Sequence, residues 1–314
     1  MKGVSNSDLA VSIIIINYKT AELVKNCIES VIEKSENFSY EVIVIDNSND
    51  DSEFNKLKAN LADKNITIIN ANDNLGFGRA NNKAAKLAKG KYVFFLNSDT
   101  LLINNAIFSL YEYLENNNKF GIAGGNLYST DLIPANSFGV DGNNLKNRKK
   151  RTGIKALFNR FFRKKRIDFN YSDEPIEVES ICGADLMISK ELFEKVGGFD
   201  ENIFMYGEDD VLSYDVKAKT GKLTCCVPYA KIIHLENGSD KEKSDFFVKN
   251  FVDGTYYRWK KICGEKVALQ YLKFLLSNSR KKYFFAKLTS NHPLKSTQKK
   301  FIDYTHKKIK ETKN

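Results

Sequence analysis

The chain has 314 residues, of which 42% are hydrophobic, enough for one large α/β domain with an appendage or for two modest domains. Only four prolines and no low-complexity tract argue against a largely disordered protein. The net charge of +10 is uneven, because residues 146–166 carry eleven Lys and Arg and no acid, and residues 241–314 carry nineteen basic and six acidic residues. Such basic segments bind phosphate groups in nucleic acids, at anionic lipid surfaces or in pyrophosphate-linked substrates.

The cysteines and the N-terminal residues indicate the cellular compartment of the protein. The five cysteines are an odd number and include no C-x-x-C pair. The first ten residues lack the apolar stretch of a signal peptide, and no apolar run is long enough to span a bilayer. We therefore expect a cytosolic protein with free thiols.

Four nearly continuous apolar runs predict strands that are buried on both faces, at residues 11–16, 41–46, 66–71 and 92–97. Helical spacing of apolar residues lies between them, at residues 22–32, 54–61 and 80–88. The third helix ends before Gly90, which we interpret as a C-cap signal. Alternating strands and helices predict an α/β fold with a parallel, doubly wound sheet.

The second half of the chain is less regular. A helix is expected at residues 106–115, and residues 178–201 suggest a strand, a helix and a turn. Residues 222–240 suggest two short strands ending at His234, and the tail from Ser244 has a helical, aromatic and basic pattern.

Polar side chains follow every strand of the first half. Ligands of doubly wound sheets bind beyond the carboxyl ends of the strands. One polar strand end is ordinary turn chemistry, but four in succession favour one ligand-facing rim. The four ends are Asn17-Tyr18, Asp46-Asn47-Ser48, Asn72-Asp73-Asn74 and Asn97-Ser98-Asp99.

The stretch "NLGFGRANN" contains Gly76 and Gly78 but does not match a dinucleotide fingerprint. That fingerprint needs a third glycine where Asn81 stands, and it follows the first strand, not the third. A glycine turn that opens a helix can still approach a diphosphate through backbone N–H groups. A tight loop with Asn caps is the alternative.

Three acidic or histidine features have both a structural and a chemical interpretation. Asp99 can form a turn or hold Mg²⁺ or Mn²⁺ beside a substrate phosphate. The run Glu208-Asp209-Asp210 can cap a helix or supply a general base for an acceptor hydroxyl. His234 can be a satisfied, partly buried histidine or a ligand, whereas His292 and His306 lie in the basic tail.

In this order, these residues resemble a family 2 glycosyltransferase with the GT-A fold, of the bacterial rhamnosyltransferase-like branch. The resemblance covers about residues 11–240. The stretches that carry it are "SIIIINYKTAELVKNCIESV", "EVIVIDNSNDDS", "NLGFGRANNKAAKLAKGKYVFFLNSDT", "GADLMISKELFEKVGGFDENIFMYGEDD" and "VPYAKIIHLENGS".

The resemblance implies a nucleotide-diphosphate-sugar donor and a divalent metal, Mg²⁺ or Mn²⁺. It implies metal contacts at Asp99 and His234. Asp99 is the last residue of the family's Asp-x-Asp position, whose first Asp is replaced here by Asn97. Asp46 matches the carboxylate that reads a pyrimidine base. The other residues expected at the nucleotide-sugar are Asn17, Tyr18, Asn47, Asn74, Gly76, Asn82, Asn97 and Ser98.

The resemblance also implies an inverting transfer in bacterial surface polysaccharide synthesis, with a glycan or polyprenyl-diphosphate-linked acceptor. We expect the base in Glu208-Asp209-Asp210, at Asp209 first and Asp210 second. The family pattern is blurred here, since Asp215 stands where Arg is usual and Gly221 comes one residue late. A non-catalytic nucleotide-sugar-binding or scaffold protein of the same fold therefore remains the alternative.

The basic segments then suggest a peripheral protein at the inner face of the cell membrane. Residues 146–166 mix cations with Phe158, Phe161 and Phe162 on one helical face, typical of an interfacial helix. The tail repeats the mixture with Tyr256, Tyr257, Trp259, Phe274, Phe284 and Phe285. A solvated basic surface is the alternative.

Two other classes fit less well. Nucleic-acid binding would require base-stacking aromatics within a known module, and none is found. A nucleotidyltransferase would require a glycine-rich loop after the first strand, where "NYKTAELV" has no glycine. The expected organisation is a GT-A domain at 1–240, with a nucleotide-binding half at 1–105, an acceptor half at 106–240 and a basic helical extension at 241–314.

Overall fold

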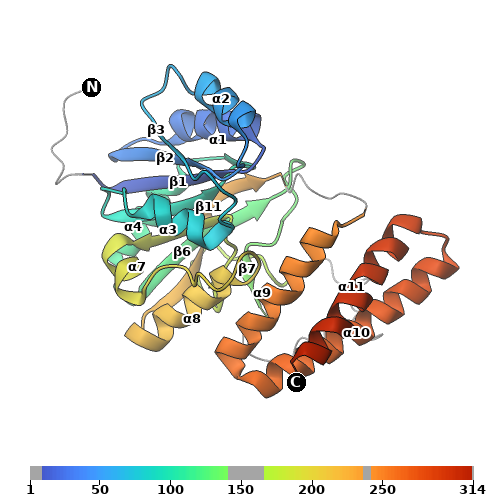
Figure 1. Ribbon diagram of the computed structural model, residues 1–314. Helices are drawn as coiled ribbons and strands as arrows, with labels where there is room; N and C mark the ends of the chain where they lie inside the picture. Colours follow the sequence, from blue (N-terminus) through green and yellow to red (C-terminus); the bar gives the residue numbers. More distant parts are fainter. Residues whose placement is uncertain (1–8, 141–165, 236–241, 313–314) are drawn as a thin grey trace. The chain divides into compact units, whose positions relative to one another are not determined.

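The computed structural model describes residues 9–140, 166–235 and 242–312, which form two compact units (Figure 1). The first unit contains residues 9–140, 166–201 and 212–235, and the second contains residues 202–211 and 242–312. The second unit thus includes a short stretch from the middle of the chain beside the expected C-terminal extension. The expected interfacial helix of residues 146–166 lies outside the described residues, except for Arg166.

A nine-stranded sheet forms the centre of the first unit, in the order β3-β2-β1-β4-β10-β6-β11-β5, with β8 also paired to β11. Its strands are β1 (Val11–Asn17), β2 (Tyr40–Asp46), β3 (Thr67–Asn70), β4 (Tyr92–Asn97), β5 (Thr100–Leu102), β6 (Phe120–Tyr128), β8 (Ile176–Val178), β10 (Asp185–Ser189) and β11 (Leu223–His234). Strands β5, β8 and β10 pair antiparallel to their neighbours, and the other six run in one direction. Two short strands, β7 (Phe138–Gly139) and β9 (Ser180–Ile181), pair separately. The predicted mainly parallel α/β sheet is confirmed.

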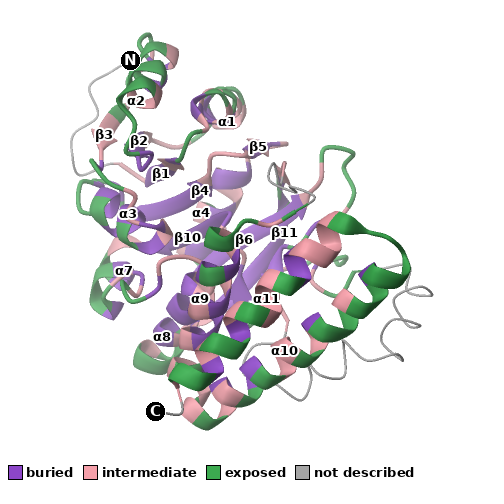
Figure 2. Cartoon of the chain, turned by 45° about the vertical axis from the view of Figure 1, so that its right-hand side comes forward, coloured by how far each residue is buried: buried purple, intermediate pink, exposed green. Residues whose placement is uncertain are grey.

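Both faces of the sheet are covered, because alternate side chains of each strand point to opposite sides. Ile13 and Ile15 pack with α1 (Ala21–Lys34), α2 (Asp51–Asn60) and α4 (Ala106–Asn116). Ile14 packs on the other side with α3 (Phe77–Ala85), α7 (Lys190–Val196) and the later turns of α8 (Glu208–Thr220). Cys225 and Cys226 likewise face opposite sides of β11. Figure 2 shows most of the sheet as buried.

Two details differ from the sequence prediction. Helix α3 ends at Ala85, so Gly90 does not cap it. A Cβ at position 90 would lie 2.5 Å from the backbone nitrogen of Ser12. Glycine is therefore needed here because the backbone approaches β1 closely. The two short strands expected before His234 are one strand, β11, whose register shifts between Val227 and Lys231. The shift locally resembles a strand break because it interrupts the alternation of buried side chains.

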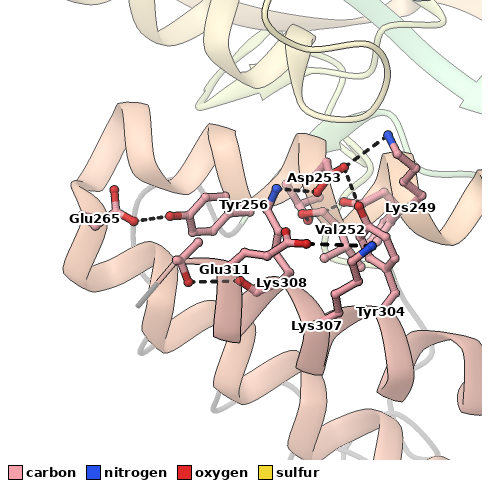
Figure 3. A network of polar contacts seen from close by, with 12 residues as sticks. Lys249, Val252, Asp253, Tyr256, Glu265, Tyr304, Lys307, Lys308 and Glu311 are labelled. Carbon is pink, nitrogen blue, oxygen red and sulfur yellow. Dashed lines mark hydrogen bonds and ion pairs between the residues drawn. The ribbon is translucent and has the colours of Figure 1, made fainter. Parts of the chain in front are cut away.

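Three helices build most of the described part of the second unit: α9 (Asp245–Cys263), α10 (Glu265–Leu288) and α11 (His292–Glu311). Their buried core contains Val248, Val252, Tyr256, Trp259, Ala268, Tyr271, Leu272 and Ile309. Polar contacts join the helices as well (Figure 3): Asp253 of α9 accepts a hydrogen bond from Tyr304 at 2.8 Å and pairs with Lys308 of α11 at 2.7 Å. The expected helical tail is therefore a packed bundle.

Packing changes the interpretation of the tail aromatics. Trp259 is fully buried and stacks on Tyr271 with ring centroids 5.6 Å apart, and Tyr256 is 7% exposed. These two rings belong to the bundle core and cannot lie on a membrane, which corrects the prediction for them. Phe284 and Phe285 are exposed as expected. Among the described residues, no helix combines the length and apolarity needed to cross a bilayer.

Candidate active site

The carboxyl ends of β1, β2 and β4 lie side by side because these strands are parallel neighbours. The register places Asn17 beside Asp46 and Ile16 beside Asn97. The Asn17 amide donates to Asp46 Oδ1 at 2.7 Å, and Thr20 and Ser98 share a hydrogen bond of 3.1 Å between their hydroxyls. The structure thus brings the predicted polar strand ends of β1, β2 and β4 to one edge of the sheet.

Asp46 is a fully buried carboxylate whose two oxygens differ in their hydrogen bonds. Asn17 and Ser48 both donate to Oδ1, whereas Oδ2 has no hydrogen-bond partner among the described residues. A buried acceptor without a donor costs free energy, so its occurrence in a folded protein needs an explanation. A donor supplied by a ligand at this edge is a direct explanation.

Glu53 and Thr20 take part in this network, although neither was predicted from the sequence. Glu53 Oε1 accepts the backbone N–H of Ala21 at 2.8 Å and the Asn17 amide at 3.4 Å. Thr20 donates to Asn17 Oδ1 at 3.1 Å. Together they orient Asn17, which in turn orients Asp46. The sequence signal was weak, because Glu53 lies in an amphipathic helix where an exposed acid is ordinary.

The glycine loop lies next to this edge. The Asn47 amide donates to Asn74 Oδ1 at 3.1 Å, and Asn47 Oδ1 accepts from Leu75 N–H at 2.8 Å. Gly76 begins helix α3 with a φ of +79°, a conformation that favours glycine. Asn47, Asn74 and Gly76 therefore form one connected loop, and Tyr18 lies at the same edge with 45% of its surface exposed.

Asn82 is placed differently from the other predicted nucleotide-sugar residues. Its side-chain oxygen accepts from Phe199 N–H at 2.9 Å, and its amide donates to Phe199 O at 2.9 Å and to Glu201 at 3.2 Å. These contacts join α3 to the loop after α7. They count against a direct ligand contact, which stays a prediction.

Asp99 and His234 meet because of strand pairing. Strand β5 pairs with β11 so that Thr100 lies opposite His234, and Leu235 N–H donates to Asp99 O at 2.8 Å. As a result, Asp99 Oδ1 is 3.2 Å from His234 Nε2, with 20% and 15% of the two side chains exposed. The residues are 135 positions apart in the sequence, so only the fold brings them together.

The pair fits a divalent cation. A carboxylate suits Mg²⁺ and Mn²⁺, and imidazole is the commonest protein ligand of metals. Two ligand atoms about 2.1 Å from one octahedral cation, at right angles to each other, are about 3 Å apart. The described residues contain no group of three or more His, Cys, Asp or Glu placed to hold a metal, so further ligands would have to come from water or a substrate. Residues 236–241, which follow this strand end, lie outside the described residues.

The acidic turn belongs to the second unit and begins helix α8. Tyr206 and Gly207 precede it with φ values of +77° and +112°, and Val211 N–H donates to Gly207 O at 3.0 Å. The helix dipole favours acids in this first turn. The three acids thus lie at the start of a helix, as the structural interpretation expected. This position is also compatible with a catalytic role.

The three acids are not equivalent. Burial and the neighbouring charge of Asp209 raise the pKa of Glu208 to about 8, and its side chain is only 7% exposed. Glu208 is therefore mostly protonated at neutral pH and shielded from an acceptor. Asp210 pairs with Arg258 of α9. Asp209 is partly exposed and accepts the backbone N–H of Asp210 at 2.8 Å, and its assignment as the base stays a prediction.

The comparisons with known proteins agree with the fold. The family model for glycosyl transferase family 2 matches residues 12–196, more than half of the chain. The chain belongs to this family.

Two curated relatives match shorter segments. An uncharacterized glycosyltransferase of Methanocaldococcus jannaschii is 32% identical over 109 residues, which is 34% of this chain and 38% of the relative. The N-acetylglucosaminyl-diphospho-decaprenol L-rhamnosyltransferase of Mycobacterium tuberculosis is 35% identical over 89 residues, which is 27% of this chain and 29% of the relative. Each match spans less than half of the relative's length.

One solved structure shows the fold. The crystal structure of GalNAc-T7 with UDP, GalNAc and Mn²⁺ superimposes with a TM-score of 0.60 at 18% identity, covering 97% of this chain and 57% of that chain. The fold is therefore of the GT-A type, with helices added at the C-terminus, as the sequence predicted.

Proposed function

We propose that this protein is an inverting glycosyltransferase. It moves a sugar from a nucleoside-diphosphate sugar to a hydroxyl of a glycan or a polyprenyl-diphosphate-linked glycan, in bacterial surface polysaccharide synthesis. The observation that carries the proposal is one sheet edge with two features. Within the described part of the chain, Oδ2 of buried Asp46 has no hydrogen-bond partner, and Asp99 lies 3.2 Å from His234. Family membership and the lipid-diphosphate substrate named for the Mycobacterium relative support it.

Each residue then has a role in binding. Asp46 Oδ2 accepts the N3–H of uracil or thymine, and Asn17 and Ser48 hold the carboxylate in place. The loop of Asn47, Asn74 and Gly76 lies toward the diphosphate, with Tyr18, Asn97 and Ser98 completing the edge. Asp99 and His234 would hold a Mg²⁺ or Mn²⁺ ion, which when bound neutralises the charge that develops on the departing diphosphate.

Asp209 is the proposed base. It accepts the proton of the acceptor hydroxyl while the oxygen attacks the anomeric carbon on the face opposite the diphosphate. The bond to the diphosphate breaks in the same step and its electrons leave with the diphosphate. Asp210 is the second candidate. If neither acid supports transfer, the non-catalytic nucleotide-sugar-binding alternative is favoured.

The pyrimidine contact predicts a specific binding result. UDP with Mn²⁺ is expected to raise the melting temperature of the wild-type protein, because a ligand at about 100 times its Kd stabilises the folded state by about 2.7 kcal/mol. In Asp46→Asn, an amide N–H would replace Oδ2 and oppose the N3–H of uracil, so most of the shift should be lost. Differential scanning fluorimetry measures both shifts.

The control for this experiment is Asp51→Asn, which makes the same change at an exposed site in α2. It should retain the full shift. A full UDP shift in Asp46→Asn would contradict the assigned contact, and no shift with UDP, dTDP or GDP in the wild type would contradict the nucleotide-sugar proposal.

The second unit offers a surface for an anionic membrane. Residues 266–302 contain nine Lys and Arg and no acid. Near the end of α10, Phe284, Phe285 and Leu288 are 63%, 60% and 68% exposed, next to the cations of residues 280–282. Apolar side chains within a cationic segment fit an anionic lipid surface, where each Lys or Arg contributes about 1 kcal/mol. We place the protein on the inner face of the cell membrane by this surface.

Vesicle binding tests this placement. The wild-type protein is expected to sediment with phosphatidylglycerol vesicles at physiological salt and much less with phosphatidylcholine vesicles. The triple variant Phe284→Ser, Phe285→Ser, Leu288→Ser should bind at least about tenfold more weakly, since apolar burial contributes about 25 cal/mol per Å². A matched control is Leu132→Ser with Ile133→Ser, also 57% and 60% exposed but in the first unit. Equal vesicle binding by the triple variant and the control would contradict the assignment of this surface to the membrane.

A further inference from the structure

The loop that leads into the acidic turn packs against helix α9. Phe204 contacts Phe246 edge to face, with ring centroids 5.6 Å apart. Tyr206 contacts Phe247 and Phe251, with centroids 5.2 Å and 5.7 Å apart. The first turns of α9 thus supply an aromatic surface on which this loop rests.

Gly254 lets the backbones of α9 and the loop approach closely. A Cβ at this position would lie 2.3 Å from Met205 O and 2.4 Å from Tyr206 O, which no side chain tolerates. Glycine inside a helix costs about 1 kcal/mol relative to alanine, so its presence in α9 needs a compensating contact. The close approach provides one, and it holds the backbone that adopts positive φ at Tyr206 and Gly207.

Arg258 lies on the same side of α9 as Gly254, one turn further along the helix. Its side chain is 5% exposed, and its guanidinium forms an ion pair through Nε with Asp210 Oδ2. The guanidinium also lies 4.9 Å from the centre of the buried Trp259 ring. A buried arginine needs a charged partner, because desolvation of an unpaired cation costs several kcal/mol. Asp210 is that partner, so the pair restricts the orientation of the first turn of α8.

We propose that Arg258 is a positioning residue for the catalytic base, and that helix α9 is part of the catalytic apparatus. By holding Asp210, Arg258 sets the rotation of the turn and thereby directs the neighbouring Asp209 toward the acceptor. Gly254 supports the same placement through the backbone. The proposal rests on the proposed function, since it assigns the support of that base, but it concerns residues outside the segment that the family model matches.

The kinetic test uses nucleoside-diphosphate release from a donor, with water as acceptor. The donor is whichever of UDP-glucose, UDP-N-acetylglucosamine and dTDP-rhamnose reacts fastest with the wild type. Arg258→Lys keeps the charge but loses the planar guanidinium, and should lower kcat by about 10²-fold with donor KM changed less than about threefold, since a misplacement near 1 Å costs about that much. Lys249→Gln, which removes an exposed charge of the same helix, should leave both constants unchanged.

A double variant with Asp210→Asn shows whether Arg258→Lys acts through the ion pair with Asp210 or by destabilising the protein in general. In an Asp210→Asn background, Arg258→Lys should reduce kcat by less than about threefold, because the contact it weakens is already gone. Gly254→Ala, which displaces the turn without touching the ion pair, should also lower kcat and leave the UDP-induced melting shift intact. It tests the proposal independently if Arg258→Lys does not fold.

The outcomes distinguish failure of the positioning role of Arg258 from failure of the proposed glycosyltransferase function. If UDP stabilises the wild type and the donor reacts, but Arg258→Lys and Gly254→Ala keep full kcat, the positioning role is wrong and the proposed function stands. An additive effect of Arg258→Lys on Asp210→Asn likewise overturns the role. If no donor reacts and no nucleotide stabilises the wild type, the proposed function fails first.

Discussion

Asp209→Asn is expected to reduce nucleoside-diphosphate release by about 10²–10⁴-fold, the range that a general base contributes. The amide cannot accept a proton from the attacking hydroxyl. Its oxygen can still accept the backbone N–H of Asp210, a contact of 2.8 Å, so the turn should keep its structure. The UDP-induced melting shift should be unchanged, since Asp46 and Asp99 are intact. Steady-state rates and melting curves measure the two effects.

Two matched variants at the same turn sharpen this prediction. Glu208→Gln replaces a residue that is mostly protonated at neutral pH, so it should reduce the rate far less. Asp210→Asn should lower the rate through loss of the Arg258 contact, by less than Asp209→Asn. If Asp210→Asn gives the larger loss, Asp210 is the base. If neither substitution changes the rate, the base lies elsewhere.

Asp99→Asn is expected to remove the response to metal and to lower the rate by about 10²–10³-fold, comparable to the loss of one strong electrostatic contact to the leaving group. Asn97 already occupies the first position of this turn, so Asp99 is the only carboxylate within Asn97-Ser98-Asp99. EDTA should abolish wild-type turnover, and Mn²⁺ should restore it. Undiminished turnover in EDTA would contradict the metal role.

Direct measurement of Mn²⁺ binding gives a readout besides activity. The fraction of free Mn²⁺, followed by electron paramagnetic resonance, should show weak binding to the wild type alone and tighter binding with UDP, because the diphosphate adds ligands. Asp99→Asn should lose the UDP-dependent binding. His234→Ala should weaken it by about 10–100-fold, and His292→Ala, in the bundle of the second unit, serves as the control. Binding unaffected by Asp99→Asn would exclude Asp99 as a ligand.

The strands and helices of the first unit could be predicted because their patterns are local. The runs ending at Asn17, Asp46 and Asn97 are apolar on both faces, which only a covered parallel sheet accommodates. Adjacent parallel strands end at one edge, so the prediction of a shared polar rim followed from the same patterns. Gly90 was misinterpreted because a cap and a close backbone approach both select glycine.

The remainder depended on contacts between distant residues. Asp99 and His234 were plausible separately, but their 3.2 Å separation results from the pairing of β5 with β11. The buried Asp46 oxygen, which finds no donor among the residues that the structure describes, and the contact from Glu53 both depend on side-chain orientations that no periodicity encodes. The aromatic tail illustrates the same limit, since Trp259 and Phe285 have similar sequence surroundings and opposite burial.

By itself, the sequence determined the α/β class, the polar edge of the sheet and the candidate acids, because each depends on neighbours a few positions apart. Only the tertiary structure decided which acids are buried and which ion pairs they form. Arg258 lies 48 residues after Asp210, and only the fold brings the two together as an ion pair. The physical reason is that burial and ion pairing depend on where chain segments meet, and those meeting points are set by the packing of whole helices and sheets.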